Sequence, residues 1–255
     1  MRARHAIRKR RRIVKRFILC TSVVLGLSVA SMFRRPAEPE KTPPPGTIAE
    51  SEAARAYYTA EDFGIETVYS AVDYNQNGVD DFTDILLGAR KDAENMPEYN
   101  GDYCDTGYPP DNIGVCSDVV WRAFKYAGYS LRDMVDRDIQ QRPQAYTKIN
   151  MPDSNIDFRR VANLRVFFDQ HAVLLTTDVG AVDQWQPGDI VIFKNNRHIG
   201  IVSDRRNSVG IPYIIHNSGQ PQREEDYLGS SDVTAHYRFD ASVLASQQLL
   251  PWHES

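Results

Sequence analysis

The sequence contains little cysteine: three thiols, at positions 20, 104 and 116, are too few for a disulfide framework. A chain of 255 residues with 42% hydrophobic residues must therefore be held together mainly by a buried core. Fourteen prolines and fifteen glycines exclude a collagen-like or a wholly disordered chain. The sequence also lacks a phosphate-binding glycine loop, paired zinc-type cysteines and internal repeats, so nothing in it indicates a nucleotide-binding, zinc-finger or solenoid protein.

Acidic residues are missing from the N-terminus. Residues 1–35 contain eleven lysines and arginines and no aspartate or glutamate. Residues 36–255 hold 19 basic and 34 acidic side chains, a net charge of −15. Because nucleic-acid backbones bind basic surfaces, we expect no nucleic-acid partner for this acidic part.

An uncharged segment follows the basic N-terminus and predicts export. Residues 17–33 carry no charge, and as a helix they would reach about 25 Å, slightly less than the hydrocarbon core of a membrane. Ser28-Val29-Ala30 resembles a signal-peptide cleavage site, so residues 1–35 are expected to form a signal peptide or a signal-anchor helix. The basic flank stays in the cytoplasm in either case, which predicts an extracytoplasmic protein, secreted or membrane-anchored.

Composition divides the remainder into three parts. Residues 36–50 are expected to form a stiff, extended linker, because five of their first eleven residues are proline. Residues 51–98 have a helix-permissive composition on both sides of a polar loop. Residues 99–245 are expected to form the main domain.

The polar loop, residues 73–84, has the pattern of a calcium-binding loop. Side chains that carry oxygen fall at loop positions 1, 3, 5, 9 and 12, and Gly78 at position 6 permits a sharp turn. The pattern resembles the loops of EF-hand and dockerin proteins, although the last position holds an aspartate instead of the longer glutamate. A surface turn rich in asparagine and glycine is the alternative. The expected Ca²⁺ ligands are Asp73, Asn75, Asn77, the carbonyl of Val79, Asp81 and Asp84.

Cys116 lies at the expected start of a helix. Apolar residues recur with helical spacing from 119 to 127, and Gly128 is expected to end the helix. Unpaired N–H groups and the helix dipole stabilise a thiolate at such a position, which makes Cys116 a candidate nucleophile. The alternative is a disulfide with Cys104 in an oxidising compartment.

Two histidines are expected at the open end of a β-hairpin. Residues 190–193 predict a buried strand, and a hairpin centred on Asn207-Ser208 places His198 directly opposite His216 on one face. One imidazole can then act as a base while the other orients it. A zinc site formed by Cys116, His198 and His216 is a further alternative.

Together these motifs resemble the NlpC-type cell-wall cysteine peptidases of the papain-like class. The shared features are the helix-starting cysteine followed by Pro-Gly-Asp-Ile-Val-Ile-Phe, His-Ile-Gly-Ile-Val and Ile-Ile-His. Residues from about 80 to 240 more closely resemble a bacterial family catalogued as domain of unknown function twelve-eighty-seven. The residues that carry this closer resemblance are 114–120, 155–161 and 215–217.

The resemblance implies an α+β fold of the papain-like (NlpC) type, with the Cys-bearing helix packed on an antiparallel sheet. It also implies that Cys116 is the nucleophile, His198 the base and His216 the residue that orients the base. The implied reaction is amide cleavage by acyl transfer, and the expected substrate is the peptide stem of peptidoglycan in the bacterial cell envelope. The alternative is a non-catalytic module of the same fold that binds cell-wall peptides.

Two further polar features bear on this interpretation. Asp118 stands where NlpC-type enzymes commonly have glycine, and an acid there would raise the pKa of the thiol unless it points away or caps a backbone N–H. Arg159 and Arg160 are candidates to hold a substrate carboxylate, since guanidinium groups bind carboxylates through two parallel hydrogen bonds. Both arginines lie in a segment that is longer than usual for this class.

Overall fold

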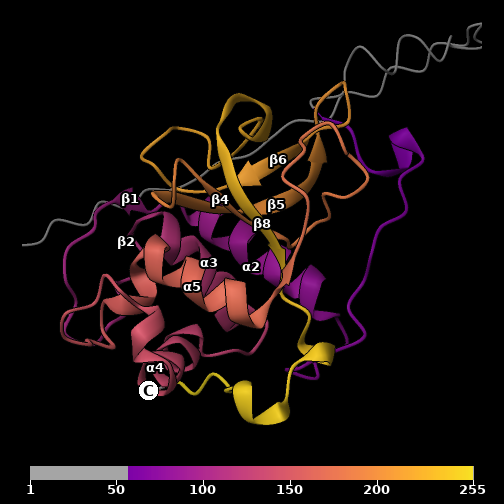
Figure 1. The fold of residues 1–255 in the computed structure, drawn as a ribbon. Coiled ribbons are helices and arrows are strands. Elements are labelled where there is room, and N and C mark those ends of the chain that lie inside the picture. The colour runs from indigo at the N-terminus through magenta and orange to yellow at the C-terminus, as the bar shows by residue number, and fades with distance from the viewer. Residues whose placement is uncertain (1–56, 255) are drawn as a thin grey trace, which may run out of the picture. The chain divides into compact units, whose positions relative to one another are not determined.

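Helices and strands are segregated into two layers in residues 57–254, the part of the chain that the computed structural model describes (Figure 1). All pairs of neighbouring strands in the six-stranded sheet are antiparallel, and the strand order is β3-β8-β4-β5-β6-β7. The expected α+β class and antiparallel sheet are thus confirmed. The expected signal segment and linker lie outside the described residues, and no helix within those residues is long and apolar enough to span a membrane.

The described elements follow one another within a single compact unit. The helices are α2 (Asp81–Asn95), α3 (Cys116–Tyr126), α4 (Leu131–Gln141) and α5 (Val161–His171). The strands of the large sheet are β3 (Val173–Leu174), β4 (Ile190–Phe193), β5 (His198–Arg206), β6 (Pro212–Ile215), β7 (Glu224–Glu225) and β8 (Val233–Arg238). A second, parallel pair consists of β1 (Glu98–Tyr99) and β2 (Ile113–Gly114). Short 3₁₀ turns are Glu61–Phe63, Pro143–Ala145, Asp157–Arg159, Leu228–Ser230, Ala241–Val243 and Ser246–Gln248.

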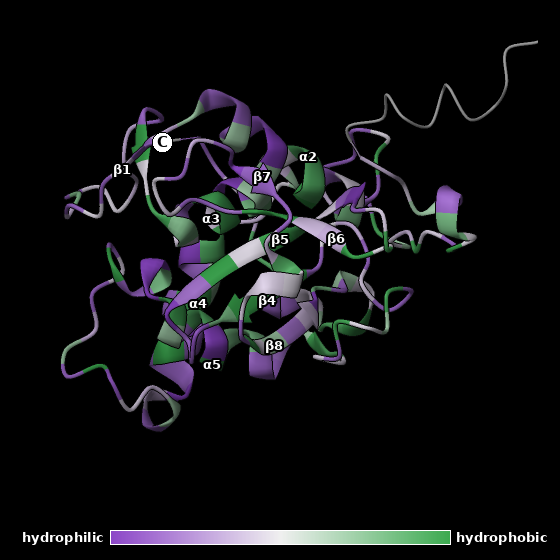
Figure 2. Cartoon of the chain, turned by 90° about the horizontal axis from the view of Figure 1, so that it is seen from above, coloured by the Kyte–Doolittle hydropathy of each residue, from purple (hydrophilic) through white to green (hydrophobic). Residues whose placement is uncertain are grey.

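The core lies between α3 and the middle of the sheet. Val120 and Phe124 of α3 are fully buried in the same cluster as Ile199 and Ile201 of β5, and Figure 2 shows hydrophobic residues on both elements. Burying such side chains stabilises the fold by about 1.5–3 kcal/mol each. This packing fixes the first turn of α3 beside the first residues of β5.

No α-helix forms within residues 57–72, so the expected helical segment before the calcium-type loop is wrong for these residues. Only a 3₁₀ turn, Glu61–Phe63, forms there. The backbone of Tyr58 instead exchanges two hydrogen bonds with Arg206, at 2.8 and 2.7 Å, and the N–H of Val68 donates to the side chain of Gln186. Tertiary partners therefore override a helix-permissive composition. The helix after the loop does form, as α2, and the Asp80 side chain caps it by accepting from the N–H groups of Phe82 and Thr83.

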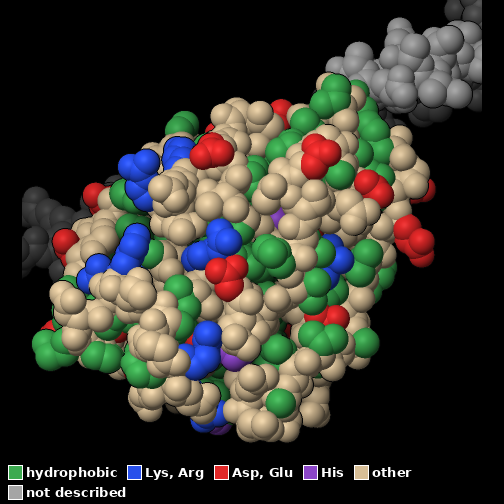
Figure 3. All heavy atoms as spheres, in the orientation of Figure 1, with side chains coloured by type: hydrophobic (Ala, Val, Ile, Leu, Met, Phe, Trp, Pro, Cys, Tyr) green, Lys and Arg blue, Asp and Glu red, His purple; other side chains and the backbone are tan. Residues whose placement is uncertain are grey.

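The outer face of the sheet carries a smaller apolar cluster and a mixed surface. Trp185, Phe193 and Val202 are buried in this cluster, away from α3. On the molecular face drawn in Figure 3, acidic and basic side chains are interspersed among neutral ones.

Candidate active site

Cys116 is the first residue of α3, as predicted, but its thiol is buried. The residue is 5% exposed. The backbone N–H of Ile199, the residue after His198, is close enough to the sulfur to favour the thiolate. Helix packing thus brings the thiol to the start of β5, next to one of the two predicted histidines.

Burial raises the pKa of the Cys116 thiol, whereas its position at a helix start was expected to lower this pKa. Removal from water raises the pKa of Cys116 to about 11, and the nearby charge of Asp118 adds to the rise. Backbone N–H groups lower the pKa, in the direction expected at a helix start, but burial outweighs them. The prediction of a stabilised thiolate is therefore wrong for this state of the protein, in which the thiol is protonated near neutral pH.

The side chains of His198 and His216 are in contact, as predicted, although the strands that carry them pair in a register different from the predicted one. His198 Nε2 lies 2.9 Å from His216 Nδ1. Strand pairing joins Ile201 to Ile215, so the residue opposite His216 is Gly200 and not His198. Because the offset is two residues, both histidines stay on the same face of the sheet.

Glu225 extends this pair into a chain of three groups. The Nε2 atom of His216 lies 3.1 Å from Glu225 Oε1, so its N–H can donate a hydrogen bond to the carboxylate. The Nδ1 atom of His216 must then accept a hydrogen bond from His198 Nε2, which leaves Nδ1 of His198 without its proton. The chain Glu225–His216–His198 therefore selects the tautomer in which His198 can act as a base through Nδ1.

Both imidazoles are held in the neutral form. Burial lowers the pKa of His198 to about 4, and the charge of Lys194 acts in the same direction. Burial, His198 and two cationic side chains lower the pKa of His216 to about 3. A neutral imidazole is the form that accepts a proton, and His198 stays in that form above about pH 4. Because its pKa is so low, His198 is a weak base in this state of the protein.

Within the described residues, no hydrogen bond joins the thiol to either imidazole. Cys104 and Cys116 are both free, so the alternative disulfide does not form in this structure. His198 Nε2 and His216 Nδ1 point at each other, not at a common point with the sulfur. No set of three histidine, cysteine, aspartate or glutamate side chains in the described part is arranged to hold a metal ion.

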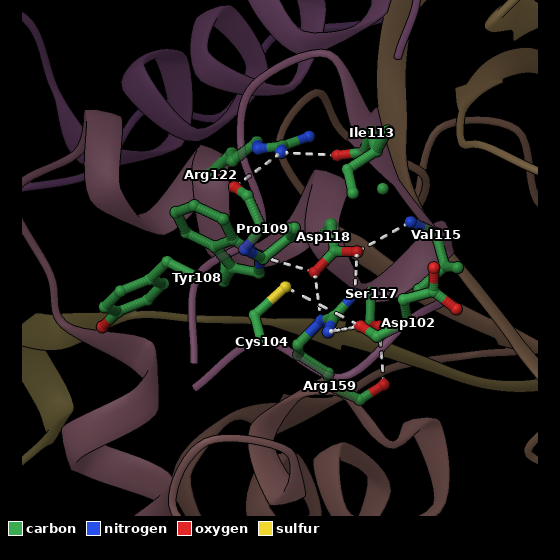
Figure 4. Close-up of polar contacts among 12 residues, drawn as sticks. Asp102, Cys104, Tyr108, Pro109, Ile113, Val115, Ser117, Asp118, Arg122 and Arg159 are labelled. Atoms are coloured by element: carbon green, nitrogen blue, oxygen red, sulfur yellow. Dashed lines mark hydrogen bonds and ion pairs between the residues drawn. The ribbon is translucent and has the colours of Figure 1, made fainter. Parts of the chain in front are cut away.

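Asp118, two residues after Cys116, forms a buried ion pair with Arg159 (Figure 4). Arg159 donates to both carboxylate oxygens of Asp118, at 2.7 and 2.9 Å, and the two side chains are 2% and 0% exposed. Asp118 also accepts from the indole of Trp121 and from the backbone N–H of Val115, each at 2.7 Å. This aspartate therefore caps the first turn of α3.

The structure gives Arg159 and Arg160 roles other than binding a substrate carboxylate. The remaining terminal nitrogen of Arg159, Nη1, donates to the Asp102 carbonyl, so its whole guanidinium is used to hold α3 and the neighbouring segment. The side chain of Arg160 is 61% exposed and lies 3.9 Å from Asp157. The substrate role of Arg159 is therefore not retained, and Arg160 has no contact that links it to the cysteine.

The ligands predicted for calcium contact one another. The Asp73 carboxylate accepts from the backbone N–H groups of Asn77 and Gly78, and the amides of Asn75 and Asn77 donate to Asp84. Asp81 and Asp84 are buried, and burial followed by repulsion from neighbouring acids raises the pKa of each. Val79 donates its N–H to the Asn77 side chain. Calcium binding stays a prediction.

Excess Ca²⁺ should raise the melting temperature if this loop binds it. A concentration 100-fold above Kd stabilises a protein by about 2.7 kcal/mol, or roughly 5–10 °C for a domain of this size. The measurement is thermal unfolding with Ca²⁺ or with chelator, repeated for Asp73→Asn. Equal melting temperatures with and without Ca²⁺ would refute the site.

Gly200 makes room for the histidine pair. A Cβ atom at this position would lie 2.6 Å from Ile214 Cγ2, 2.9 Å from the Ile215 carbonyl and 3.2 Å from His216 Cβ. Gly200→Ala should therefore lower the free energy of unfolding by about 1–3 kcal/mol, the usual cost of overpacking. Urea unfolding should show little change for Gly229→Ala, where the nearest atom is 3.4 Å away. An equally small change for both variants would contradict this packing.

Sequence reasoning missed two members of the site. Glu225 lies in β7, which pairs with β6. Tyr99, in β1, lies close enough to Cys116 and Asp118 for both to raise its pKa, after burial, the largest cause. Neither has a local sequence signal, because β1 and β7 are two-residue strands without an apolar pattern.

The fold and the site define an α+β protein with a buried helix-starting cysteine beside a His–His–Glu chain. The chain belongs to the family described as Domain of unknown function (DUF1287), which matches residues 86–239. It is 38% identical over 166 residues to "Uncharacterized protein YijF" of Escherichia coli (strain K12), covering 61% of this chain and 80% of that protein. No solved structure matches the chain. The predicted family is thus confirmed, and the calcium-type loop precedes the matched region.

Proposed function

We propose that this protein is an exported thiol hydrolase of the NlpC-type, papain-like class, which cleaves amide bonds in peptidoglycan stem peptides. The observation that supports it best is the arrangement of Cys116 at a helix start, beside the strand whose first residue is the base His198. His198 is in turn oriented by His216 at 2.9 Å. A nucleophile, a base and an orienting group are the three parts that such catalysis needs.

In the proposed reaction, Cys116 and His198 start as a neutral pair. As the sulfur attacks the amide carbonyl, the thiol proton passes to Nδ1 of His198. That proton then goes to the departing amine nitrogen, and the acyl group remains on the sulfur as a thioester. Water attacks the thioester, gives its proton through His198 and restores the thiol.

The negative oxygen of the tetrahedral intermediate needs hydrogen-bond donors. The backbone N–H of Cys116, in the first turn of α3, is one candidate. The hydroxyl of Tyr99, a residue that is 49% exposed and close to Cys116, is a candidate for the second.

One observation favours a second candidate function, a non-catalytic module that binds cell-wall peptides. The thiol is buried and protonated, whereas many catalytic cysteines are partly exposed thiolates. The hydrolase therefore requires that substrate binding bring the carbonyl to the sulfur.

Purified peptidoglycan distinguishes the two functions. The protein and its Cys116→Ala variant are incubated with peptidoglycan, and the soluble fragments and new amino groups are measured. The hydrolase should release fragments that the variant does not release. Identical fragment profiles, together with sedimentation of both proteins with the insoluble polymer, would instead indicate the binding module.

A further inference from the structure

Arg223 is a buried arginine with hydrogen-bond donors to spare. It is 8% exposed, and its Nη2 donates to the carbonyl of Pro97 at 3.0 Å. Its Nε and Nη1 atoms are closed off from solvent and have no partner. Three N–H bonds of one charged group therefore have no protein partner, which is costly in a folded protein unless a ligand or a water molecule satisfies them.

The neighbouring arginines differ from Arg223 because each has an acidic partner. Arg90 pairs with Asp204 at 2.5 Å and with Glu224 at 2.8 Å. Arg205 pairs with Glu224 at 3.0 Å. The nearest acid along the chain on the other side, Glu225, pairs with His216. Among the described residues, Arg223 is thus the arginine of this group without an ion pair, although its charge is close enough to Glu225 to oppose the rise that burial causes in the pKa of that carboxyl.

Arg223 also lines a cavity of about 440 Å³ between α2 and the strands β5 to β7. Pockets of this size hold small molecules or a few peptide residues. The charged side chains in its wall are three arginines and two glutamates, and Asp204 next to the wall pairs with one of the arginines. The charged residues are Arg90, Glu94, Arg205, Arg223 and Glu224.

Hydrogen bonds to backbone carbonyl groups link Arg223, in the wall of the cavity, to the candidate active site. The carbonyl of Arg223 accepts the N–H of His216 at 2.9 Å. The Pro97 carbonyl that binds Arg223 also binds the side chain of Asn217, whose amide binds the Gly114 carbonyl, two residues before Cys116. A group held by Arg223 is therefore held in a fixed relation to the base and the nucleophile.

We propose that Arg223 binds a free carboxylate of an acidic peptide substrate, and that the cavity beside it receives that part of the peptide. This inference rests on the proposed hydrolase function, because it names the feature that the enzyme recognises in a stem peptide. Charge-assisted binding of a carboxylate by a buried guanidinium discriminates strongly against an uncharged amide of the same shape.

The test measures binding, so it does not depend on hydrolysis. Calorimetry on the full-length Cys116→Ala protein compares a synthetic stem peptide with a free glutamate α-carboxylate and the same peptide amidated there. The acid should bind at least 10-fold more tightly, and Arg223→Gln should remove this preference. Arg160→Gln, an exposed arginine that does not line the cavity, should keep it. If Arg223→Gln does not fold, Arg223→Lys should keep the charge and weaken the preference.

Equal binding of the two peptides, or a preference that survives in Arg223→Gln, would overturn the proposal. Inorganic phosphate that competes as well as the acidic peptide would overturn the assignment to a carboxylate. If the preference holds while the wild-type protein releases no fragments from peptidoglycan, the hydrolase fails and the carboxylate site stands.

Discussion

His198→Ala should lower kcat/KM for amide cleavage by about 10³-fold, since a positioned general base contributes 10²–10⁴-fold. His216→Asn should lower kcat/KM by less, roughly 10–100-fold. The asparagine keeps a hydrogen-bonding group next to His198, but it no longer fixes which nitrogen of His198 carries the proton. The assay is the release of amino groups from a defined stem peptide. His253→Ala, an exposed histidine near the C-terminus, is the matched control and should keep full activity.

The pH dependence of the same assay checks the burial of the base. Because the pKa of His198 is lowered to about 4, protonation should remove the base only near that pH. Activity should therefore persist well below pH 6.5, where an exposed histidine would already be protonated. An acid limb at pH 6.5 or above, or full activity in His198→Ala, would contradict the assigned role.

Arg159→Ala should lower the free energy of unfolding by about 3–5 kcal/mol, because it leaves the buried carboxylate of Asp118 without its partner. For a domain of about 200 residues this corresponds to a fall of roughly 6–20 °C in the melting temperature. The loss should be structural, because Asp118 caps the helix that carries Cys116.

The adjacent arginine supplies the control. Arg160→Ala removes a side chain that is 61% exposed, and it should change the free energy of unfolding by less than about 0.5 kcal/mol. Chemical denaturation of both variants gives the comparison. Similar losses for the two would show that the Asp118–Arg159 pair does not carry the expected energy.

Patterns within one element could be predicted from the sequence. The apolar run of β4 and the helical spacing of α3 depend on local periodicity, and both elements form at the expected residues. His236, within the short strand β8, is fully buried between Trp185 and the carboxylate of Asp189. Local patterns succeed because burial and backbone geometry act over a few residues.

The pairing of distant residues could not be predicted in the same way. The hairpin register differs by two residues because the chain needs a loop from Asn207 to Ile211, with irregular pairing before it, in place of a two-residue turn. Arg159 and Asp118 are 41 residues apart, and either could equally have faced solvent. Glu225 joins the site only because β7 pairs with β6. These contacts depend on the folded topology.

The proposed hydrolase requires Cys116 to be the nucleophile, and a covalent probe tests this directly. A stem peptide that carries a thiol-reactive electrophile in place of the scissile amide is incubated with the protein at neutral pH, and the labelled site is mapped by mass spectrometry. The peptide should orient its electrophile toward the buried sulfur, so Cys116 should be labelled in preference to Cys104, and His198→Ala should slow the labelling. Labelling of Cys104 alone, or equal labelling rates in wild type and His198→Ala, would contradict the hydrolase.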